Sequence, residues 1–462
     1  MPIEIRNPAA PDQIVATYDE TPDNALDEVV ARARAAQLEW AALPQPERGV
    51  MVTNFVNALE TRSEEIAKSI TKEMGKPLAE ARGEAMKALG EARASVARAN
   101  APIGEVFGSQ MPGTVSYSTR RPRGVILGIN PWNFPFSTPM RKAIPALVYG
   151  NAIILKPASL TPGAVALMAE VAASTLPENL VQAVIGRGAL GQALAEHRGI
   201  DAVSFTGSVE VGKRVATAAA GHLAEVSLEL GGKNPAILND ASDLEKVLDQ
   251  ILLAAFAVCG QRCTAVSRVI VHRDIEEAVV SGLAARAAAM EPMDGMIEGA
   301  KIGPLASAQQ LEDVAGFVSR AVSDGAVIAA GGHRLESPGG GYFYAPTILR
   351  GVTRDMEIAR QEVFGPVLSL IAYDTVDEAL SIANDTAFGL SSCLYSERTD
   401  LVERFVAESE SGMLHVNAGS FPENHLPFVG IKDSSMGVGG SNGPSTIQFY
   451  TTEHAVYRRA CV

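Results

Sequence analysis

The sequence contains little cysteine, few aromatic residues and no long hydrophobic run. Its 462 residues include 4 cysteines and 2 tryptophans, and aromatic residues make up 5% of the chain. So few cysteines cannot form a disulfide framework over this length, which favours a reducing, cytoplasmic environment. The apolar run from Ile251 to Cys259 falls well short of the roughly 20 residues that a membrane helix needs. Because the N-terminus also lacks a basic stretch followed by an apolar one, we expect neither a membrane span nor a signal peptide.

Basic residues are outnumbered by acidic ones, with 39 lysines and arginines against 53 aspartates and glutamates and a net charge of -14. Nucleic-acid binding relies on clustered lysines and arginines that neutralise phosphates, so we expect no nucleic-acid partner. A metal site is not expected either, because Cys259 and Cys263 have no histidine cluster near them that would complete a zinc-ligand pattern.

The length of the chain indicates two or three domains, since one hydrophobic core does not grow to this size. Hydrophobic residues make up 47% and charged residues 20%, the balance of a globular protein. Residues 1–20 are predicted to be mixed strand and loop, and the chain from there to about residue 100 is predicted to be largely helical. Apolar residues recur from Leu26 to Trp40 with near-helical spacing, and the Ala-, Glu- and Arg-rich stretch from Glu47 to about Asn100 has one clear break, at Gly75-Lys-Pro77.

Short runs that are apolar on both faces alternate with helical segments over the rest of the chain. Such runs are typical of strands in a parallel sheet covered by helices. We therefore predict two α/β domains that meet near residue 230, and two further strands, at 113–121 and 446–452, that pair as a small extension. The runs are 125–129, 152–155, 181–185, 202–205 and 226–230 in the first domain, and 269–271, 326–329 and 367–371 in the second.

Two stretches carry the features of a nucleophile and a base. Cys263 directly follows a Gly-Gln-Arg turn, and Glu229 stands upstream, before Gly231 and Gly232. A thiol attacks a carbonyl as the thiolate, so it needs a partly exposed, electropositive seat. A carboxylate in a cleft can accept a proton through water. The paired glycines suggest that a cofactor or substrate comes close to the backbone.

A further stretch has the features of a phosphate site. Phe205-Thr-Gly207-Ser208 follows a predicted strand and opens a helix, where free N–H groups and the positive end of the helix dipole attract a pyrophosphate. Its spacing matches neither the G-x-G-x-x-G fingerprint nor a Walker A loop, so an ordinary strand-to-helix turn is the alternative. Taken alone, Asn133 can be explained by an Asx turn, and Lys156 by a solvated lysine at the end of a strand.

Together these motifs resemble the aldehyde dehydrogenase superfamily. The resemblance rests on the Glu229 and Cys263 stretches with Asn130-Pro-Trp-Asn-Phe-Pro135 and Gln361-Glu-Val-Phe-Gly-Pro366, and it covers nearly the whole chain. It implies an α/β fold with a Rossmann-like cofactor domain, an α/β catalytic domain and a small β oligomerisation arm. The implied boundaries are 1–110 and 123–230 for dinucleotide binding, 231–430 for catalysis, and 111–122 with 431–462 for the arm.

The resemblance also implies a role for each site residue. Cys263 is the expected nucleophile, Glu229 the base that activates water, and Asn133 a donor to the oxyanion of the adduct. Arg141 and Phe428 are expected at the substrate, with Arg141 at a position that contacts the substrate carboxylate in succinate semialdehyde dehydrogenases. The expected contacts to NADP or NAD are Trp132, Lys156, Ser159, Gly207, Ser208, Glu362 and Phe364.

The residue at position 159 bears on the choice of cofactor. Lys156 is expected on the adenosine ribose, and NAD-specific relatives commonly carry a glutamate three residues after it, where this chain has Ser159. A carboxylate would repel a 2′-phosphate, whereas a serine leaves room for one. The sequence therefore favours NADP, with NAD or dual use left open.

The resemblance leaves the aldehyde open. Succinate semialdehyde dehydrogenases have an arginine six residues before the nucleophile and a cysteine two after it, where this chain has Ala257 and Ala265. The stretches 261–264 and 449–452 are more similar to those of 2-oxoglutarate semialdehyde dehydrogenases. Asn417 falls in the segment that the resemblance implies closes the substrate tunnel. We expect oxidation of an ω-oxo acid by a homodimer or homotetramer. The alternatives are an aromatic or aliphatic aldehyde dehydrogenase, a CoA-acylating dehydrogenase and a non-catalytic scaffold.

Overall fold

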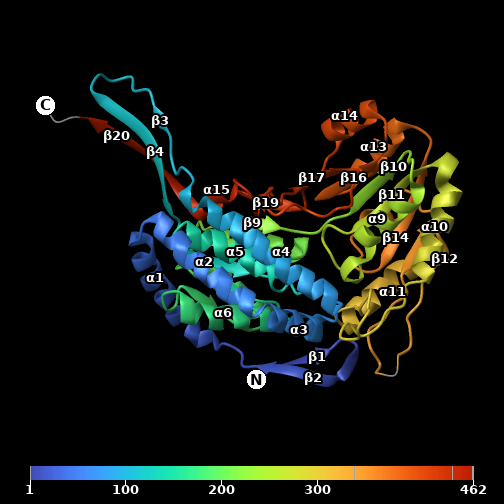
Figure 1. Cartoon of the computed structure of the whole chain (residues 1–462), viewed down its shortest axis with the longest axis horizontal. Coiled ribbons are helices and arrows are strands. Elements are labelled where there is room, and N and C mark those ends of the chain that lie inside the picture. Colours follow the sequence, from blue (N-terminus) through green and yellow to red (C-terminus); the bar gives the residue numbers. More distant parts are fainter. Residues whose placement is uncertain (1, 338, 440, 460–462) are drawn as a thin grey trace.

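The computed structural model describes residues 2–337, 339–439 and 441–459. Figure 1 shows two α/β bodies side by side, the first drawn mainly in blue and green and the second in yellow and orange, with a thin arm that projects from the first body. Both bodies contain a largely parallel sheet with helices against it. The predicted α/β class is thereby confirmed.

Strands that are buried at every position form the centre of the first sheet. β5 (Val125–Ile129) and β6 (Ala152–Lys156) are such strands, and a strand buried on both faces requires helices on each side of the sheet. Within the described residues the sheet has the order β19-β9-β8-β5-β6-β7, and its pairs are parallel except for β19 with β9. The remaining strands are β7 (Val181–Ala183), β8 (Ala202–Thr206), β9 (Glu225–Glu229) and β19 (Ser435–Gly437).

The helices of the first body supply these layers. The predicted break at Gly75-Lys-Pro77 separates two of them, and Gly75 has a φ of 82°, the left-handed conformation that commonly ends a helix. The helices are α1 (Leu26–Ala42), α2 (Gln45–Thr61), α3 (Ser63–Met74), α4 (Leu78–Val96), α5 (Ser137–Val148), α6 (Gly163–Thr175), α7 (Gly188–Glu196) and α8 (Val209–Ala220), with 3-10 turns η1 (Asp23–Ala25) and η2 (Ala97–Asn100). A hairpin of β1 (Ile3–Asn7) and β2 (Ala10–Tyr18) precedes them.

The second sheet has the order β12-β13-β14-β11-β10-β16-β17 in the described residues, and its pairs are parallel except for β12 with β13. Its strands are β10 (Asn234–Leu238), β11 (Val266–His272), β12 (Val327–Ala330), β13 (Thr347–Arg350), β14 (Val367–Tyr373), β16 (Ser391–Tyr395) and β17 (Met413–Val416). The helical elements are α9 (Leu244–Phe256), η3 (Ala257–Gly260), η4 (Arg273–Ile275), α10 (Glu276–Ala288), α11 (Ala308–Ser323), α12 (Glu357–Arg360), α13 (Val376–Asn384) and α14 (Thr399–Glu408).

Four of these strands were not predicted, namely β10, β13, β16 and β17. In β10 the residue Pro235 argues against a central strand, because proline cannot donate a ladder hydrogen bond. The ladder register shifts between Asn234 and Pro235, which accommodates the proline. Polar residues hide β16, whose sequence begins Ser-Ser-Cys although every position is buried.

The arm pairs two segments that are far apart in sequence. β20 (Thr451–Arg459) runs antiparallel to β4 (Thr114–Pro122), and β3 (Val106–Phe107) adds a third strand. Pairing of the 113–121 strand with the end of the chain is thus confirmed. The predicted strand at 446–452 is wrong for most of its length, because α15 (Thr446–Tyr450) occupies it and buries Phe449 and Tyr450 in the core of the first body.

The boundary of the arm also differs from the sequence-based one. Residues 431–450 had been assigned to the arm, but β19 extends the first sheet and α15 packs against the first body. The short strand β18 (Ile431–Lys432) pairs with β15 (Phe388–Gly389), close to the second body. Of the described residues after 430, only β20 (Thr451–Arg459) belongs to the three-stranded arm.

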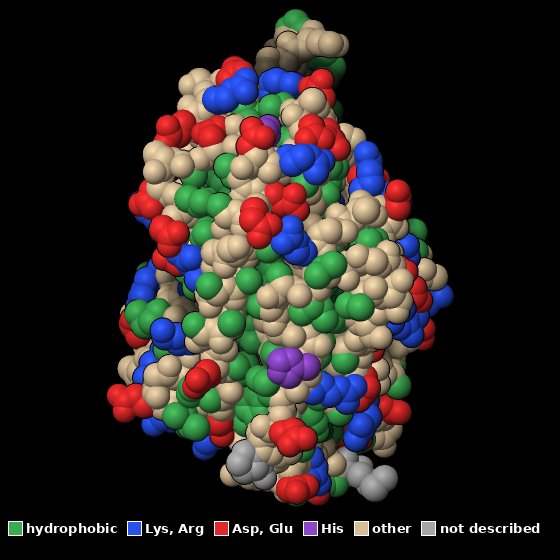
Figure 2. All heavy atoms as spheres, turned by 90° about the vertical axis from the view of Figure 1, so that its right-hand side faces the viewer, with side chains coloured by type: hydrophobic (Ala, Val, Ile, Leu, Met, Phe, Trp, Pro, Cys, Tyr) green, Lys and Arg blue, Asp and Glu red, His purple; other side chains and the backbone are tan. Residues whose placement is uncertain are grey.

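The surface of the second body carries both signs of charge. Figure 2 shows basic and acidic side chains interspersed over this face. Many of them form ion pairs, such as Arg320 with Glu357 and Arg273 with Asp374. Every helix in the described ranges is too short or too polar to cross a lipid bilayer.

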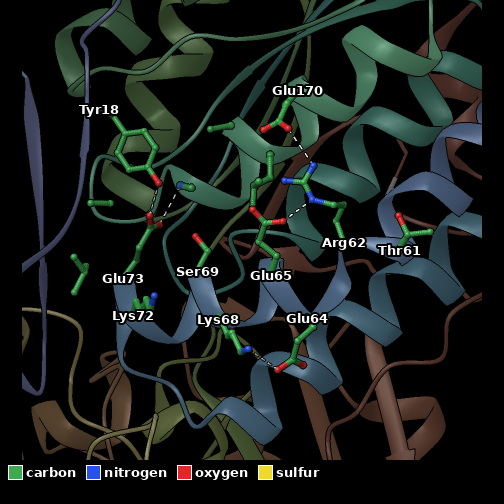
Figure 3. A pocket seen from close by; sticks show the side chains of 15 residues that line it. Tyr18, Thr61, Arg62, Glu64, Glu65, Lys68, Ser69, Lys72, Glu73 and Glu170 are labelled. Carbon is green, nitrogen blue, oxygen red and sulfur yellow. Dashed lines mark hydrogen bonds and ion pairs between the residues drawn. The ribbon is translucent and has the colours of Figure 1, made fainter.

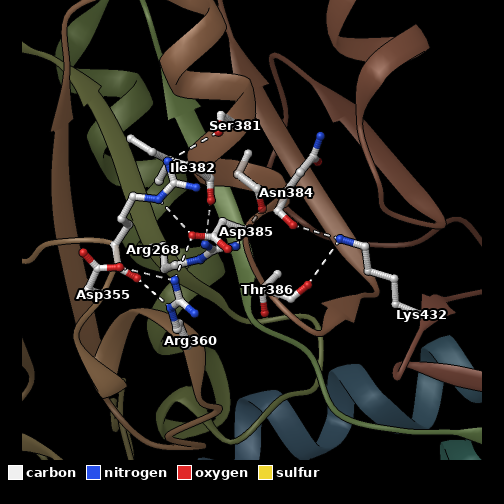
Figure 4. A network of polar contacts seen from close by, with 11 residues as sticks. Arg268, Asp355, Arg360, Ser381, Ile382, Asn384, Asp385, Thr386 and Lys432 are labelled. Carbon is white, nitrogen blue, oxygen red and sulfur yellow. Dashed lines mark hydrogen bonds and ion pairs between the residues drawn. The ribbon is translucent and has the colours of Figure 1, made fainter.

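A buried arginine joins the second sheet to the loop that precedes β10. Arg268 on β11 is 1% exposed, and its guanidinium donates to the carbonyl oxygens of Lys233, at 2.8 and 3.2 Å, and of Ile382 and Ala383, both at 2.9 Å (Figure 4). The last two carbonyls lie near the C-terminal end of α13, where the helix leaves its acceptors without partners. The contacts fix the backbone at Lys233, next to the paired glycines.

A cavity of about 750 Å³ lies on the outer side of the first body, against α3 and α6 (Figure 3). At its base the carboxylate of Glu73 accepts hydrogen bonds from the Tyr18 hydroxyl at 2.9 Å and from the Gly163 N–H at 3.0 Å. Burial raises the pKa of Glu73 to about 7. Because the carboxylate satisfies the first N–H of α6, we assign it a structural role as a helix cap.

Candidate active site

The loop before Cys263 has an unusual backbone. Val258, Cys259 and Gly260 have φ values of 58°, 55° and 70°, all in the left-handed region. A β-branched residue in this region costs about 1–3 kcal/mol, so other contacts must hold the loop. One such contact is the Glu80 carboxylate, whose two oxygens both accept from the Val258 N–H at 3.1 Å.

Side-chain amides from both bodies hold the next part of the loop. Asn133 donates from Nδ2 to the carbonyl oxygen of Gln261 at 2.8 Å. The Gln261 side chain, fully buried, donates to the Val258 carbonyl at 3.1 Å and accepts from the Ala306 N–H at 2.9 Å. The predicted oxyanion donor is therefore in direct contact with the turn that carries the nucleophile.

Asn234 fixes the backbone at Cys263 itself. Its Nδ2 donates to the carbonyl oxygens of Cys263 at 2.7 Å and Ala265 at 2.9 Å, and its Oδ1 accepts from the Ser391 N–H at 3.0 Å. Sequence reasoning did not identify Asn234, because an asparagine before a proline gives no signal of its own.

The paired glycines make room for two of the protein's own groups, and Gly231 also lines the cofactor cavity described below. A Cβ at Gly231 would lie 2.4 Å from Oε2 of Glu362, and a Cβ at Gly232 would lie 2.4 Å from the carbonyl oxygen of Cys263. The groups that come close to this backbone are thus the protein's own Glu362 and nucleophile loop. Glu362 also accepts from the Gly232 N–H at 3.1 Å.

Cys263 lies between two cavities and lines both of them. Its side chain packs against the small apolar cluster of Leu390, Met413 and Phe428. One cavity, of about 250 Å³, is lined by residues that were predicted to bind the cofactor, and we call it the cofactor cavity. The other, of about 280 Å³, opens past Arg141 and Phe428, and we call it the aldehyde cavity.

The cofactor cavity brings most of the predicted contacts together. Trp132 and Phe364, far apart in sequence, meet edge to face with ring centroids 5.4 Å apart. Phe364 has a φ of 56°, so its position depends on a strained turn. The predicted residues that line the cavity are Trp132, Asn133, Gly207, Ser208, Cys263, Glu362 and Phe364.

The start of α8 fits a pyrophosphate. Ser208 occupies the N-cap position, yet its side chain makes no capping hydrogen bond, so the first N–H groups of the helix have no side-chain acceptor. Behind it, the buried Lys142 donates to the carbonyl of Ile129 at 2.9 Å and to the Thr206 hydroxyl at 2.8 Å. Lys142 thereby fixes the ends of β5 and β8, between which a dinucleotide lies in sheets of this kind.

Lys156 and Ser159 lie outside both cavities, at the end of β6. Lys156 is buried, donates to the Pro157 carbonyl at 2.9 Å, and has its pKa lowered to about 8 by burial. β6 pairs with β5, so these residues stand one strand away from the Trp132 loop. The structure thus leaves them beside the cofactor cavity rather than in its wall.

Glu229 does not line either cavity. It is 4% exposed, and its Oε1 accepts from the Ser441 N–H at 3.1 Å. Burial raises the pKa of Glu229 to about 7, although Arg141 and the Ser441 N–H act in the opposite direction. The carboxylate influences the nucleophile electrostatically, since it is among the groups that raise the pKa of Cys263.

The surroundings of Cys263 are less electropositive than the sequence suggested. Burial and, to a lesser extent, the carboxylates of Glu362 and Glu229 raise the pKa of the thiol to about 12, against the opposing effect of Arg141 and Arg262. The thiol is therefore protonated at neutral pH in this arrangement. Deprotonation requires a base or a change in the positions of the neighbouring carboxylates.

The aldehyde cavity contains the predicted Arg141 and Phe428. Arg141 forms a bidentate ion pair with the buried Glu91, with both oxygens at 2.7 Å, and its guanidinium lies 5.1 Å from the centre of the Phe428 ring. Ala257 lines the cavity where succinate semialdehyde dehydrogenases have a second arginine. Asn417 does not line the cavity, because its side chain forms a pair of hydrogen bonds with the backbone of Ser396.

Helix α4 contributes a row of site residues that sequence reasoning missed. Lys76, just before the helix, forms a buried ion pair with Glu84 and donates to the Asn133 carbonyl at 2.8 Å. Glu84 in turn accepts from the first N–H groups of α5. The only available signal was the spacing of Glu80, Glu84, Lys87 and Glu91, which places them on one helix face.

Comparison with known proteins identifies a family and several relatives that this chain resembles. Residues 1–456 match the model of the aldehyde dehydrogenase family. The chain is 37% identical over 460 residues to the alpha-ketoglutaric semialdehyde dehydrogenase of Bacillus subtilis, covering 98% of this chain and 94% of that protein. It is 35% identical over 464 residues to a betaine aldehyde dehydrogenase of Cereibacter sphaeroides, covering 99% and 93%.

Solved structures give the same result. The lactaldehyde dehydrogenase of Escherichia coli superimposes with a TM-score of 0.96 at 33% identity, covering 100% of this chain and 96% of that chain. A 3,6-anhydro-L-galactose dehydrogenase in complex with NAP has a TM-score of 0.95 at 32% identity, covering 99% and 96%. The chain belongs to the aldehyde dehydrogenase family. It is therefore an NAD(P)-dependent aldehyde oxidoreductase.

The charge of Glu362 should control the reactivity of the thiol. Burial raises the pKa of Glu362 to about 7, so at pH 8.5 its carboxylate is largely ionised and holds the pKa of Cys263 up. In Glu362→Gln the thiol pKa falls, and we expect iodoacetamide to alkylate Cys263 about threefold to tenfold faster, which corresponds to a shift of up to roughly one pKa unit. Mass spectrometry of the peptide that contains Cys263 measures the rate.

The control for this experiment is Glu357→Gln, which removes an exposed carboxylate that is paired with Arg320. That variant should be alkylated at the wild-type rate. If Glu362→Gln is also alkylated at the wild-type rate, Glu362 does not act on the thiol through its charge.

Proposed function

We propose that the enzyme oxidises an ω-oxo acid, such as succinate semialdehyde or 2-oxoglutarate semialdehyde, to the corresponding dicarboxylic acid. The observation that carries this proposal is the position of Cys263 between a cofactor cavity and a second cavity lined by cationic side chains. Those cations are Lys87, Arg141 and Arg262. Two curated relatives, 37% and 36% identical, are named alpha-ketoglutaric or alpha-ketoglutarate semialdehyde dehydrogenases.

In the proposed mechanism Cys263 attacks the carbonyl carbon of the aldehyde. The carbonyl oxygen becomes an oxyanion, and Asn133 stabilises it through the amide hydrogen that the Gln261 carbonyl does not occupy, together with the backbone N–H of Cys263. Bound NAD(P)⁺ supplies the chemistry of hydride acceptance, which turns the adduct into a thioester. The thiol proton must leave before or during the attack, since burial favours the neutral thiol. It passes through water to the ionised carboxylate of Glu229 and from there to solvent, which leaves Glu229 ionised for the next step.

Glu229 is the proposed base for hydrolysis of the thioester. With a pKa of about 7 it is ionised in a substantial fraction of molecules at neutral pH, and it can then accept a proton from water. Water adds to the thioester carbon, the carbon–sulfur bond breaks, and the products are the carboxylic acid and the free thiol. Because Glu229 lines neither cavity, its carboxylate has to turn toward Cys263 to reach that water.

The surroundings of Arg141 favour a second candidate as well. Its charge is paired with Glu91, and the rest of the wall includes Phe134, Phe421 and Phe428. An uncharged aromatic or aliphatic aldehyde fits such a wall. A cationic aldehyde, the class to which betaine aldehyde belongs, is disfavoured because it would meet like charges.

Initial rates with a panel of aldehydes test the proposed reaction. We expect kcat/KM for succinate semialdehyde or 2-oxoglutarate semialdehyde to exceed that for benzaldehyde and butanal by about tenfold or more, since a hydrogen bond between charged groups contributes roughly 1.5–3 kcal/mol. The acid should form without CoA, and Cys263→Ala should form none while it still binds the cofactor.

Three outcomes would contradict the proposal. A higher kcat/KM for benzaldehyde or butanal would mean that the substrate is an apolar aldehyde. A requirement for CoA would mean that the acyl group is transferred to CoA. Full activity in Cys263→Ala would exclude Cys263 as the nucleophile.

We propose NADP as the preferred form of the nicotinamide cofactor. In support, Ser159 is half-buried and uncharged at the end of β6, close to Lys156, where an acidic side chain would repel a 2′-phosphate. Solved complexes of related enzymes contain NAP in one case and NAD+ in another, at 32% and 28% identity.

Ser159→Glu should reverse this preference. The new carboxylate repels the 2′-phosphate, so we expect the ratio of kcat/KM for NADP to that for NAD to fall by about tenfold or more, which corresponds to at least ~1.4 kcal/mol. Ser159→Ala, which removes the hydroxyl without adding charge, is the matched control and should change the ratio little. An unchanged ratio in Ser159→Glu would place the 2′-phosphate elsewhere.

We propose that the domains work as the family suggests, with cofactor binding by 1–110 and 123–230, catalysis by 231–430, and self-association through the arm. In support, the arm exposes large apolar side chains that a single copy leaves in water. They include Val106 at 81%, Tyr457 at 71%, Val115 at 54% and Phe107 at 52% exposed.

The arm proposal predicts a homodimer or homotetramer in sedimentation equilibrium. The double variant Val106→Asp with Tyr457→Asp should shift the mass to a smaller assembly, because it places two charges in the buried contact. Leu223→Asp is the control, since Leu223 is 92% exposed on the body rather than on the arm. A monomeric wild type, or an unchanged mass in the double variant, would remove the arm from self-association.

A further inference from the structure

The aldehyde cavity is lined by five ionisable side chains besides Cys263, and four of them are held by contacts within the protein. Glu84 forms its buried pair with Lys76 at 2.5 Å and also accepts two backbone N–H groups of α5. The carboxylate of Glu80 is engaged by the Val258 N–H. These acids support the fold of the site and are not available to a substrate.

The two arginines of the cavity are held as well, Arg141 by a carboxylate and Arg262 by neutral acceptors. Arg141 directs Nε and Nη2 to the two oxygens of Glu91. Arg262 is 6% exposed and donates from Nη2 to the Thr264 hydroxyl at 3.1 Å and to the Ser420 carbonyl at 3.0 Å, with its guanidinium 4.3 Å from the Phe421 ring centre. Both side chains are held in place by contacts within the protein.

Lys87 is in a different situation. Its ammonium group has three donors, and among the described residues it makes one hydrogen bond, to the Pro422 carbonyl at 2.9 Å. The nearest carboxylate oxygen, on Glu91, is 4.0 Å away and already belongs to the bidentate pair with Arg141. The side chain is 32% exposed, so a bound molecule can reach it.

The position of Lys87 suits the far end of a substrate. It stands on the cavity face of α4, one turn beyond Gly83 and Glu84, and its partner Pro422 belongs to the segment that runs to Phe428 on the opposite wall. Burial and the nearby Arg141 lower the pKa of Lys87 to about 8. An anion next to the ammonium group would relieve this unfavourable environment.

We infer that Lys87 is the specificity-determining residue of the aldehyde cavity and that it binds the carboxylate at the far end of an ω-oxo acid. This inference rests on the proposed function, because it assigns the group that recognises the proposed substrate class. Arg141 then acts as a positioning residue, which holds Glu91 and the Phe428 wall. The uncharged end of the substrate, the aldehyde, points to Cys263 along the apolar part of the cavity.

The test compares Lys87→Met with wild type on succinate semialdehyde and on butanal, a four-carbon aldehyde without the carboxylate. We expect the ratio of kcat/KM for succinate semialdehyde to that for butanal to fall by about 10- to 100-fold, mainly through KM, because methionine keeps the length of the side chain but not its charge. Lys87→Arg should restore most of the ratio. Lys72→Met, which removes an exposed lysine on α3, should leave it unchanged.

The outcomes separate this inference from the proposed function. If the wild type does not prefer succinate or 2-oxoglutarate semialdehyde to the uncharged aldehydes, the proposed substrate class is wrong and the inference fails with it. If the wild type prefers them but Lys87→Met keeps the wild-type ratio, or loses both activities in proportion, Lys87 does not bind the carboxylate. Circular dichroism of Lys87→Met, compared with wild type, identifies a proportional loss that comes from misfolding. In that case Lys87→Gln, which also removes the charge, decides: a fall in the ratio supports the inference, and a wild-type ratio overturns it.

Discussion

Most of the site depends on how side-chain amides hold the loop before Cys263. That loop has consecutive residues in the left-handed region, which the chain does not adopt without support. Asn133 binds it from the first body and Asn234 from the second, and each amide contacts a carbonyl within two residues of the nucleophile. The relative position of the two α/β bodies therefore fixes the thiol between its two cavities. A change at either amide would move the thiol and the oxyanion donor together.

The charges of the site follow one rule, which is that buried ions occur in pairs or are bound to backbone groups. Lys76 with Glu84 and Arg141 with Glu91 are pairs, and Arg268 is held by carbonyl oxygens. The two ion pairs support the wall of the aldehyde cavity without adding net charge to it. Lys87 has no close carboxylate partner, so its charge is stabilised most by a ligand of opposite sign. Under the proposed function it is therefore the residue that discriminates between substrates.

The sequence predicted the parts that carry strong local signals. Fully apolar runs such as 125–129 gave the strands of the first sheet, and the Cys263 and Glu362 motifs gave residues that do line a common cavity. It failed where tertiary packing overrides local preference. Pro235 concealed β10, and the β-branched tail 446–452 became a helix because Phe449 and Tyr450 are buried there. The ion pairs of α4 could not be predicted from local sequence, because a partner such as Arg141 lies 50 residues away from Glu91.

The segment around Ser441, which leads into the arm, contacts both Glu229 and the wall of the aldehyde cavity. Ser441 donates its N–H to Glu229 at 3.1 Å, and its carbonyl oxygen accepts from the Phe428 N–H at 2.7 Å, so one residue contacts both the proposed base and a wall of the aldehyde cavity. β19, just before it, pairs with β9, which ends at Glu229. Since β20 of the arm follows after α15, the segment that orients the base is anchored in the first sheet on one side and in the arm on the other. The arm and the proposed base Glu229 are thus linked by the short stretch of chain between Ser441 and Thr451.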